Sequence, residues 1–198
     1  MPEVTYERYE GQDAAAQLDT FLPAYEEVYA EPPYSEGPSD VAAFIEHFLL
    51  HTQRPGMRLI IARDGEDVIG FTYGYLLPRD TGWWTNVDRV LPDDFTREDG
   101  NRTWVILELA VREKWRRRGI AAALHAALLE GLHVERVTLT VRPEPEAAPA
   151  QSAYTSWGYR TVGVSHPWED APFYNAMILE LNGRPTPAPP DTRDRPRR

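Results

Sequence analysis

Residues 104–132 constrain the fold of this chain more than any other stretch of its sequence. WVILELAV (104–111) is an almost continuous apolar run, which is typical of a β-strand in a protein core. REKWRRR (112–118) follows as a short charged loop, and the Ala/Leu-rich segment 119–132 predicts a helix with a buried face. A buried strand that leads through a short loop into a buried helix predicts a mixed α/β fold.

The spacing of apolar residues divides the rest of the chain into helices and strands. Between residues 14 and 29 this spacing is helical, and Ser39-Asp40 caps a second helix that ends before Pro55. Two β-rich runs within 57–77 flank a turn and predict a hairpin. The other predicted elements are strands at 4–9, 136–141, 159–165 and 174–181, a short helix at 147–157, and a long polar insertion at 78–103.

Length and composition indicate a single domain with a tail. A chain of 198 residues with 42% hydrophobic residues fits one globular domain, which we expect to span residues 1–182. The segment 183–198 is rich in Pro and Arg and has almost no apolar side chains, so we expect a disordered tail. Whether that tail is a weak electrostatic tether or a plain terminus stays open.

Several classes of protein are excluded by composition. The chain has no cysteine, so disulfides and thiolate chemistry are absent, and its five histidines show no metal-ligand spacing. The net charge of −10 repels phosphate backbones, so no nucleic-acid partner is expected. The N-terminal residues lack the apolar core of a signal peptide, and no stretch approaches roughly 18 apolar residues. We therefore expect a cytoplasmic protein with no membrane contact.

The loop and helix start at 112–122 have the features of an anion site. Backbone N–H groups at a helix start lack intrahelical partners, and the helix dipole makes this end positive. Gly119 lets the backbone approach an anion closely, while Arg116, Arg117 and Arg118 add charge and bidentate donors. These features predict a pyrophosphate site. The fingerprints GxGxxG and GxxxxGK[ST] are absent, so neither a dinucleotide nor an NTP is the favoured ligand.

The same stretch resembles the cofactor motif of the GCN5-related N-acetyltransferases, the GNAT superfamily. Arg116-x-x-Gly119-x-Ala121 is similar to the family's R/Q-x-x-G-x-G/A motif, and the element order over residues 4–181 matches the family. The resemblance implies a central mixed, mostly antiparallel sheet of six to seven strands flanked by about four helices. It also implies acetyl-CoA as cofactor, bound by Leu109, Ala110, Val111, Arg116, Arg117, Arg118, Gly119, Ile120, Ala121 and Ala122.

Two positions depart from the family pattern. Ala121 stands where glycine is common, which narrows the room at the phosphate. The stretch 142–145, Arg-Pro-Glu-Pro, stands where the family often has an asparagine, so the resemblance supports no particular cofactor contact on that side.

Tyr154 is the predicted general acid. The segment 153–159 is similar to the family's A-x-Y-x-x-x-G-F/Y, whose tyrosine lies beside the thioester sulfur. A phenol with a pKa near ~10 is well matched to a leaving thiolate. The alternative is that Tyr154 only packs against Trp157 and Tyr159.

Glu108 is the candidate general base, because it is the only acid within the apolar strand. Strand parity places it on the face of Trp104, Ile106 and Ala110, whereas many family members have the base on the opposite face. A bulge that exchanges the faces, a base acting through water, an ion pair with an arginine, and the absence of a dedicated base all stay open.

The resemblance implies an acceptor site formed by the first two helices, their loop and the insertion. Carboxylates and aromatic rings there suit a cationic amine, although a solvated acidic face and a core, lid or dimer role for the tryptophans are alternatives. The predicted substrate-binding residues are Glu27, Glu31, Tyr34, Trp83 and Trp84.

The resulting functional prediction is an N-acetyltransferase. It would transfer acetyl from acetyl-CoA to a primary amine of a small cationic metabolite or antibiotic-like molecule by direct attack. A protein N-terminal or lysine acetyltransferase is the alternative, and a non-catalytic acyl-CoA-binding module is a second. A homodimer is compatible with the sequence.

Overall fold

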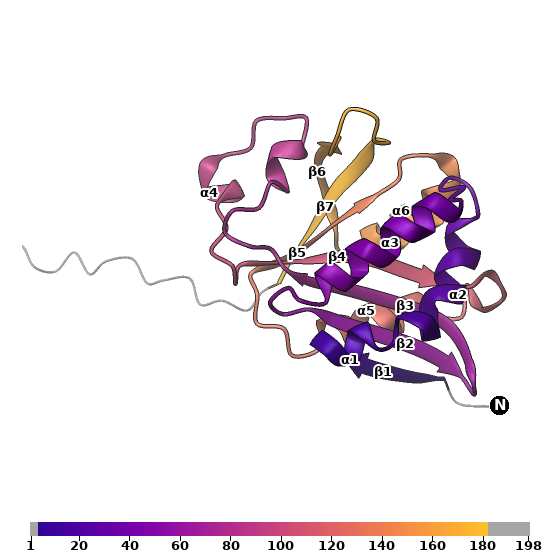
Figure 1. Ribbon diagram of the computed structural model, residues 1–198. Helices are drawn as coiled ribbons and strands as arrows, with labels where there is room; N and C mark the ends of the chain where they lie inside the picture. Colours follow the sequence, from indigo (N-terminus) through magenta and orange to yellow (C-terminus); the bar gives the residue numbers. More distant parts are fainter. Residues whose placement is uncertain (1–3, 182–198) are drawn as a thin grey trace, which may run out of the picture.

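One seven-stranded sheet organises the protein. The computed structural model describes residues 4–181, so the tail predicted at 183–198 lies outside the described residues. The strand order is β1-β2-β3-β4-β5-β7-β6, and all neighbours are antiparallel except the parallel pair β4 and β5 (Figure 1). The mixed, mostly antiparallel sheet is therefore confirmed. The strands are β1 (Thr5–Tyr9), β2 (Arg58–Asp64), β3 (Asp67–Leu76), β4 (Thr103–Val111), β5 (Arg136–Val141), β6 (Arg160–Ser165) and β7 (Tyr174–Glu180).

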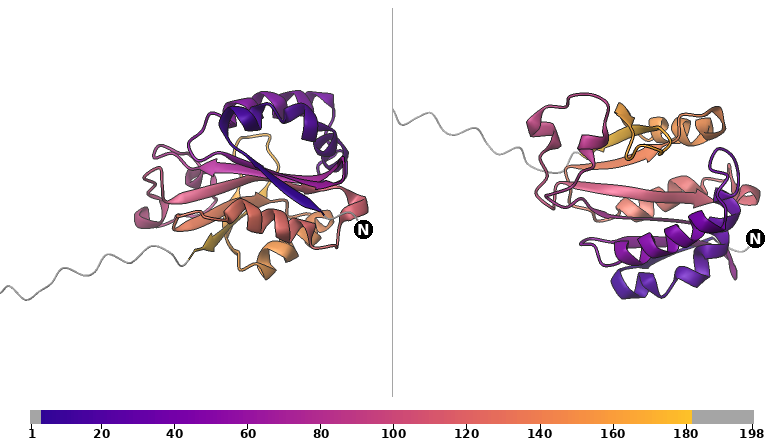
Figure 2. Two further views of the ribbon diagram at one scale, coloured as in Figure 1. Left: turned by 90° about the horizontal axis from the view of Figure 1, so that it is seen from below. Right: turned by 45° about the horizontal axis from the view of Figure 1, so that its top comes forward.

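Helices cover both faces of the sheet, and each face has its own apolar core. Figure 2 shows α1 (Gly11–Ala15), α2 (Leu18–Tyr29) and α3 (Pro38–His51) on one face, with α5 (Ile120–Leu129) and α6 (Ala148–Ser156) on the other. The helix predicted at 14–29 is interrupted at residues 16–17, so it forms α1 and α2. The core on the α2/α3 face is rich in phenylalanine: Phe21, Phe44, Phe48 and Phe71. The core on the opposite face contains Trp104 and two leucines of α5, Leu124 and Leu128.

β4 and β5 diverge, and this divergence opens the sheet. The two strands pair only where residues 103–105 meet residues 136–138. Beyond this point β4 has no partner on that side among residues 4–181, and residues 107–109 become partly exposed within an otherwise buried strand. Because an unpaired strand edge leaves backbone N–H and C=O groups free, this opening can receive an extended ligand.

A β-bulge lies in β4 at the start of this opening. Tyr73 pairs with Glu108 and Gly74 pairs with Ile106, so Leu107 is an extra residue with no partner on β3. Gly74 is required here, because a Cβ atom at this position would lie 1.9 Å from the carbonyl oxygen of Val105. The bulge exchanges the faces to which the residues after it point.

The insertion 78–103 covers the free edge of β6. It contains a 3₁₀ turn, η1 (Trp84–Asn86), and α4 (Asp93–Thr96), which lies at the left of the fold in Figure 1. Val87 forms a β-bridge with Ser165, and a buried ion pair of 2.9 Å between Glu98 and Arg136 fastens the segment to β5. An open sheet edge invites aggregation, so this insertion protects the sheet.

Candidate active site

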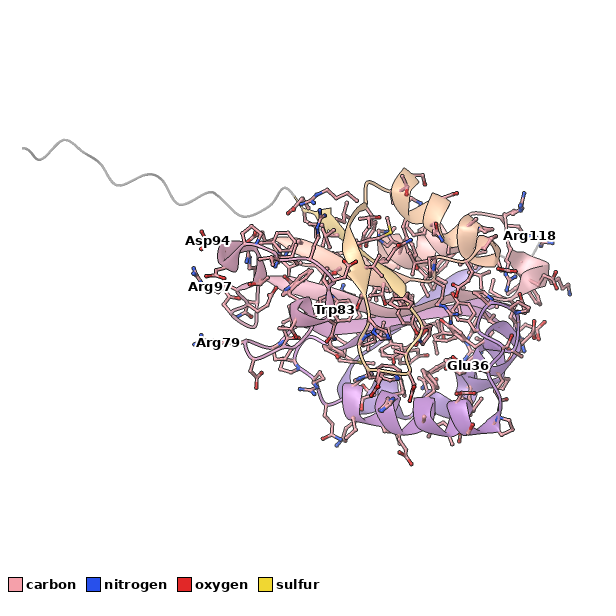
Figure 3. All side chains as sticks on the ribbon, turned by 90° about the horizontal axis from the view of Figure 1, so that it is seen from above. Glu36, Arg79, Trp83, Asp94, Arg97 and Arg118 are labelled. Atoms are coloured by element: carbon pink, nitrogen blue, oxygen red, sulfur yellow. The ribbon has the colours of Figure 1, made fainter. Side chains whose placement is uncertain are left out.

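A cleft of about 670 Å³ lies where the loop after β4, the start of α5, the α6 segment and the α2–α3 loop meet. Tyr154 lines it, and so do all but one of the predicted cofactor contacts: Leu109, Ala110, Val111, Arg116, Arg117, Gly119, Ile120, Ala121 and Ala122. The exception is Arg118, which does not line the cleft and is exposed at the edge of the molecule (Figure 3).

The start of α5 presents free backbone donors to this cleft. Gly119 caps the helix in a left-handed conformation, with φ of 78°. The first helical bond of α5 runs from the N–H of Ala123 to the carbonyl of Gly119, so the N–H groups of residues 120–122 precede the hydrogen-bonded part of the helix. No side chain caps this helix start. The geometry fits a pyrophosphate, which needs several converging N–H donors.

Arg116 braces the cofactor loop. Its Nε donates to the carbonyl of Val111 at 2.9 Å, and its two Nη atoms donate to the carboxylate of Glu31 at 2.8 and 2.9 Å. Arg117 also lines the cleft and has a left-handed backbone with φ of 61°, a conformation that is uncommon outside glycine. Of the three consecutive arginines, Arg117 is thus the one left to contact an anion in the cleft.

Glu27 and Glu31 were expected to bind the acceptor, and the structure gives them a different role. Glu31 holds Arg116, and Glu27 forms an ion pair with Arg112 at 2.9 Å. These two pairs fasten the C-terminal part of α2 to the loop after β4. Both carboxylates are therefore already neutralised, which is a poor starting point for binding a cationic amine.

The bulge decides where Glu108 points. Trp104 and Ile106 pack in the core under α5, whereas Ala110 packs in the core under α2 and α3. Glu108 lies with Ala110, because it accepts a hydrogen bond from the hydroxyl of Tyr29 in α2. The parity prediction is thus wrong for Trp104 and Ile106, and the alternative of a bulge that exchanges the faces is correct.

Glu108 is a carboxyl that holds its proton unusually strongly. Burial raises its pKa to about 8; the Tyr29 hydrogen bond partly opposes this rise and the charge of Glu36 adds to it. A group with this pKa can take a proton from an ammonium near neutral pH and release it again, as a general base must.

Tyr154 combines a packed ring with an available hydroxyl. The ring makes edge contacts with Trp157 and Tyr159, with centroids 5.5 and 5.6 Å apart, as the packing alternative anticipated. Within residues 4–181, no group forms a hydrogen bond with its hydroxyl. Burial raises the pKa of this phenol above its usual value, and the charges of Tyr34 and Glu108 raise it further. The phenol therefore stays protonated and can donate.

The remaining predicted acceptor residues lie in different places. Tyr34 lines the cleft, and its ring meets that of Tyr29 edge-on with centroids 4.8 Å apart. Trp83 donates its indole N–H to Thr138 of β5 at 3.1 Å, away from Arg118 at the cofactor loop (Figure 3). Trp84 is a core residue whose indole N–H donates to buried Glu98, so it does not reach the cleft.

Three residues beside Glu108 were not predicted from the sequence: Tyr25, Tyr29 and Glu36. Tyr25 and Tyr29 occupy buried positions one helical turn apart, so their spacing indicates only a core face. Glu36 lies in the loop before α3, where an acidic residue is ordinary. The sequence did contain one sign of these residues. Tyr25 and Tyr29 place phenols, instead of purely apolar side chains, at two core positions one helical turn apart.

The chain matches one protein family over most of its length. Residues 18–159 match the model described as "Acetyltransferase (GNAT) family". The chain belongs to the GNAT acetyltransferase family. This membership makes acetyl-CoA the cofactor. No curated protein sequence matches it.

Solved structures with the GNAT fold resemble this protein at low sequence identity. PH1933 from Pyrococcus horikoshii OT3 is 18% identical, with a TM-score of 0.63 over 91% of this chain and 99% of that one. Arabidopsis thaliana NAA60 in complex with a bisubstrate analogue is 18% identical, with a TM-score of 0.60 over 92% and 100%. Diaminobutyrate acetyltransferase EctA from Paenibacillus lautus, in complex with its substrate and coenzyme A, is 18% identical, with a TM-score of 0.53 over 91% and 96%. This level of identity supports the shared GNAT fold.

Membrane-spanning helices and metal-binding clusters are both absent from residues 4–181 of this GNAT protein. None of their helices is long and apolar enough to cross a bilayer. No group of three or more His, Cys, Asp or Glu side chains there is placed to hold a metal ion.

Proposed function

We propose that this protein transfers the acetyl group of acetyl-CoA to a primary amine of a small cationic metabolite or antibiotic-like molecule. The observation that carries the proposal is the position of Glu108. A carboxyl with a pKa of about 8 lies beside the opening between β4 and β5, and its charge is close enough to affect the pKa of Tyr154 in the cofactor cleft. A binding module needs an anion cradle, but it does not need these two groups.

The cleft residues fit acetyl-CoA. The N–H groups of residues 120–122 and the side chain of Arg117 would hold the pyrophosphate. The unpaired edge of β4 at residues 107–109 would offer backbone groups to the amides of the pantetheine arm. When bound, acetyl-CoA supplies a thioester whose carbonyl carbon forms a bond to the amine nitrogen as the carbon–sulfur bond breaks.

The protein residues would manage the protons of this exchange. Glu108 accepts a proton from the acceptor ammonium, directly or through one water, and so frees the nitrogen lone pair. Tyr154 donates its proton to the departing sulfur. The acylated nitrogen loses its excess proton to solvent, Glu108 releases the proton that it accepted, and the phenol regains one from solvent. Both side chains then return to their starting states, and one proton is released overall for each acetyl group transferred.

A small acceptor is favoured by the surroundings of Glu108. Its carboxyl is enclosed by Tyr29 and by residues whose pKa values it influences, including Tyr25, Tyr34 and Tyr73. The structural similarity to EctA, which is bound to L-2,4-diaminobutyric acid, is consistent with an acceptor of this size. An N-terminal or lysine acetyltransferase is the second candidate, and a cytoplasmic location and a homodimer remain predictions.

The test measures amine-dependent thiol release from acetyl-CoA with panels of small amines and of short peptides. Wild type is compared with Glu108→Gln, and coenzyme A binding is followed by thermal shift. We expect turnover of small amines, a fall of about 10²-fold in kcat for Glu108→Gln, and unchanged binding of coenzyme A. Turnover of peptides alone would support the second candidate. Coenzyme A binding without any turnover would support the non-catalytic module.

A further inference from the structure

Two carboxylates beside the opening between β4 and β5 lack a cationic partner. Glu108 accepts its hydrogen bond from Tyr29, and Glu36, labelled in Figure 3, accepts one from the hydroxyl of Tyr25 at 2.6 Å. Within residues 4–181, neither forms an ion pair with a lysine or an arginine, whereas Glu27 and Glu31 on the same helix and loop both do. Partly buried carboxyl groups are usually paired with a cation, and a bound ammonium would favour the ionised form of both groups.

The fold holds these two carboxylates close to one turn of α2. The backbone N–H of Glu36 donates to the carbonyl of Tyr29 at 2.9 Å, which brings the α2–α3 loop back onto the helix end. The rings of Tyr25 and Tyr29 are in contact, with centroids 4.5 Å apart. Glu36, Tyr25, Tyr29 and Glu108 therefore form one continuous chain of contacts.

The neighbouring cation does not neutralise this pair. Arg142 follows β5 on the other side of the opening, and its Nε and Nη2 donate to Glu144 at 3.1 and 2.6 Å. Its guanidinium lies over the ring of Tyr174, 5.7 Å from the ring centroid. Arg142 is thus compensated by its own carboxylate and leaves Glu36 and Glu108 without a cationic partner.

We propose that the acceptor carries two ammonium groups, and that Glu36 selects it by binding the ammonium that is not acetylated. This inference rests on the proposed function, in which the reacting nitrogen lies at Glu108. A monoamine would satisfy Glu108 and leave Glu36 uncompensated, whereas a diamine would satisfy both. The ring of Tyr34, which lines the cleft, adds an aromatic surface that favours an ammonium over a neutral group.

The experiment compares straight-chain diamines, from propane-1,3-diamine to hexane-1,6-diamine, with n-alkylamines of the same carbon number. The readout is the ratio of kcat/KM for each diamine to that of its monoamine. We expect wild type to prefer the diamine by about tenfold or more at one chain length, as a charge-assisted contact would give. Glu36→Gln keeps an acceptor for the Tyr25 hydroxyl, so the variant should fold, and its ratio should fall about tenfold.

Glu46→Gln is the matched control, because Glu46 is an exposed carboxylate on α3 and its substitution makes the same change in net charge. Its ratio should equal that of wild type. Equal ratios in wild type and Glu36→Gln would overturn the inference and leave the proposed acetyltransferase activity intact. If no amine is turned over, the proposed function fails. The inference would then still be decided by the Tm of the coenzyme A complex. Diamines should raise this Tm more than monoamines in wild type, and Glu36→Gln should remove the difference.

Discussion

A single residue, Leu107, determines the chemistry available at the opening of the sheet. Because Leu107 has no partner on β3, the residues after it exchange faces, and Glu108 meets Tyr29 of α2 instead of the core beneath α5. The carboxyl then shares a partly buried environment with phenols, and burial raises its pKa to about 8. The bulge thus turns an ordinary strand position into a candidate base.

Tyr29 should tune this base. Its hydrogen bond lowers the pKa of Glu108, so Tyr29→Phe should raise that pKa further. In the plot of kcat/KM against pH, the ascending limb should then shift to higher pH by about one pH unit. The reason is that a hydrogen bond to a charged group contributes about 1.5 kcal/mol. Tyr9→Phe is the control, because Tyr9 donates to Glu7 on β1 at 2.9 Å. Coincident profiles for Tyr29→Phe and wild type would contradict the assignment.

Tyr154 should act through its hydroxyl. Tyr154→Phe is expected to lower kcat by about 10²-fold, because the sulfur would leave without a proton donor, while the affinity for coenzyme A stays nearly unchanged. Tyr159→Phe removes a buried hydroxyl from the same aromatic cluster, one that contacts His125 at 2.9 Å and does not line the cleft. If Tyr154→Phe and Tyr159→Phe lower kcat by the same factor, Tyr154 contributes through packing alone.

At the scale of elements, the start of α5 supplies the donors and α2 holds the loop that leads to it. The free N–H groups of residues 120–122 depend on where the helix begins, which Gly119 sets through its left-handed conformation. Arg116–Glu31 and Arg112–Glu27 then fix the loop against α2. Glu27 of α2 and Glu31 in the loop after it therefore brace the loop that follows β4.

Gly119→Trp should abolish cofactor binding by filling this helix start. Saturation of wild type with acetyl-CoA at 100 times Kd should add about 2.7 kcal/mol, or roughly 5 to 10 °C in Tm. Gly119→Trp should show no shift. Gly100→Trp, in the insertion before β4, introduces a similar left-handed strain at a position that does not line the cleft and should keep the shift. A full shift in Gly119→Trp would place the pyrophosphate elsewhere.

At the scale of the whole molecule, the opening between β4 and β5 links the two faces of the sheet. The cofactor loop continues into α5 on one face, while Glu108 and its phenols face α2 and α3 on the other. Pairing between β4 and β5 ends after residue 105 of β4, so the freed edge of β4 can contribute to both sites. The same arrangement keeps a carboxyl in surroundings that disfavour its charge, which has a cost in stability.

The free energy of unfolding should therefore fall with rising pH in a defined window. The pKa of Glu108 is about 8 in the folded state against an ordinary 4.5, so between these values the folded protein retains a proton that the unfolded chain releases. Glu108→Gln should have a higher Tm than wild type at pH 8 and nearly the same Tm at pH 4.5. Melting curves at the two pH values test this. A difference that does not change with pH would show that Glu108 is not the group responsible.

The local sequence was sufficient to predict the strands of the sheet and the order of strand, loop and helix over residues 104–132. Apolar spacing identified all seven strands, and Gly119 with its arginines marked the helix start, because a strand, a turn and a helix N-terminus depend on residues close together in the chain. The charge state of Glu108, the bracing role of Glu31 and the core position of Trp84 depended on tertiary structure. Each is set by partners far away in sequence, and the bulge at Leu107 arises from its pairing with β3. Strand parity counts residues along one chain, so it cannot include a residue that the neighbouring strand leaves unpaired.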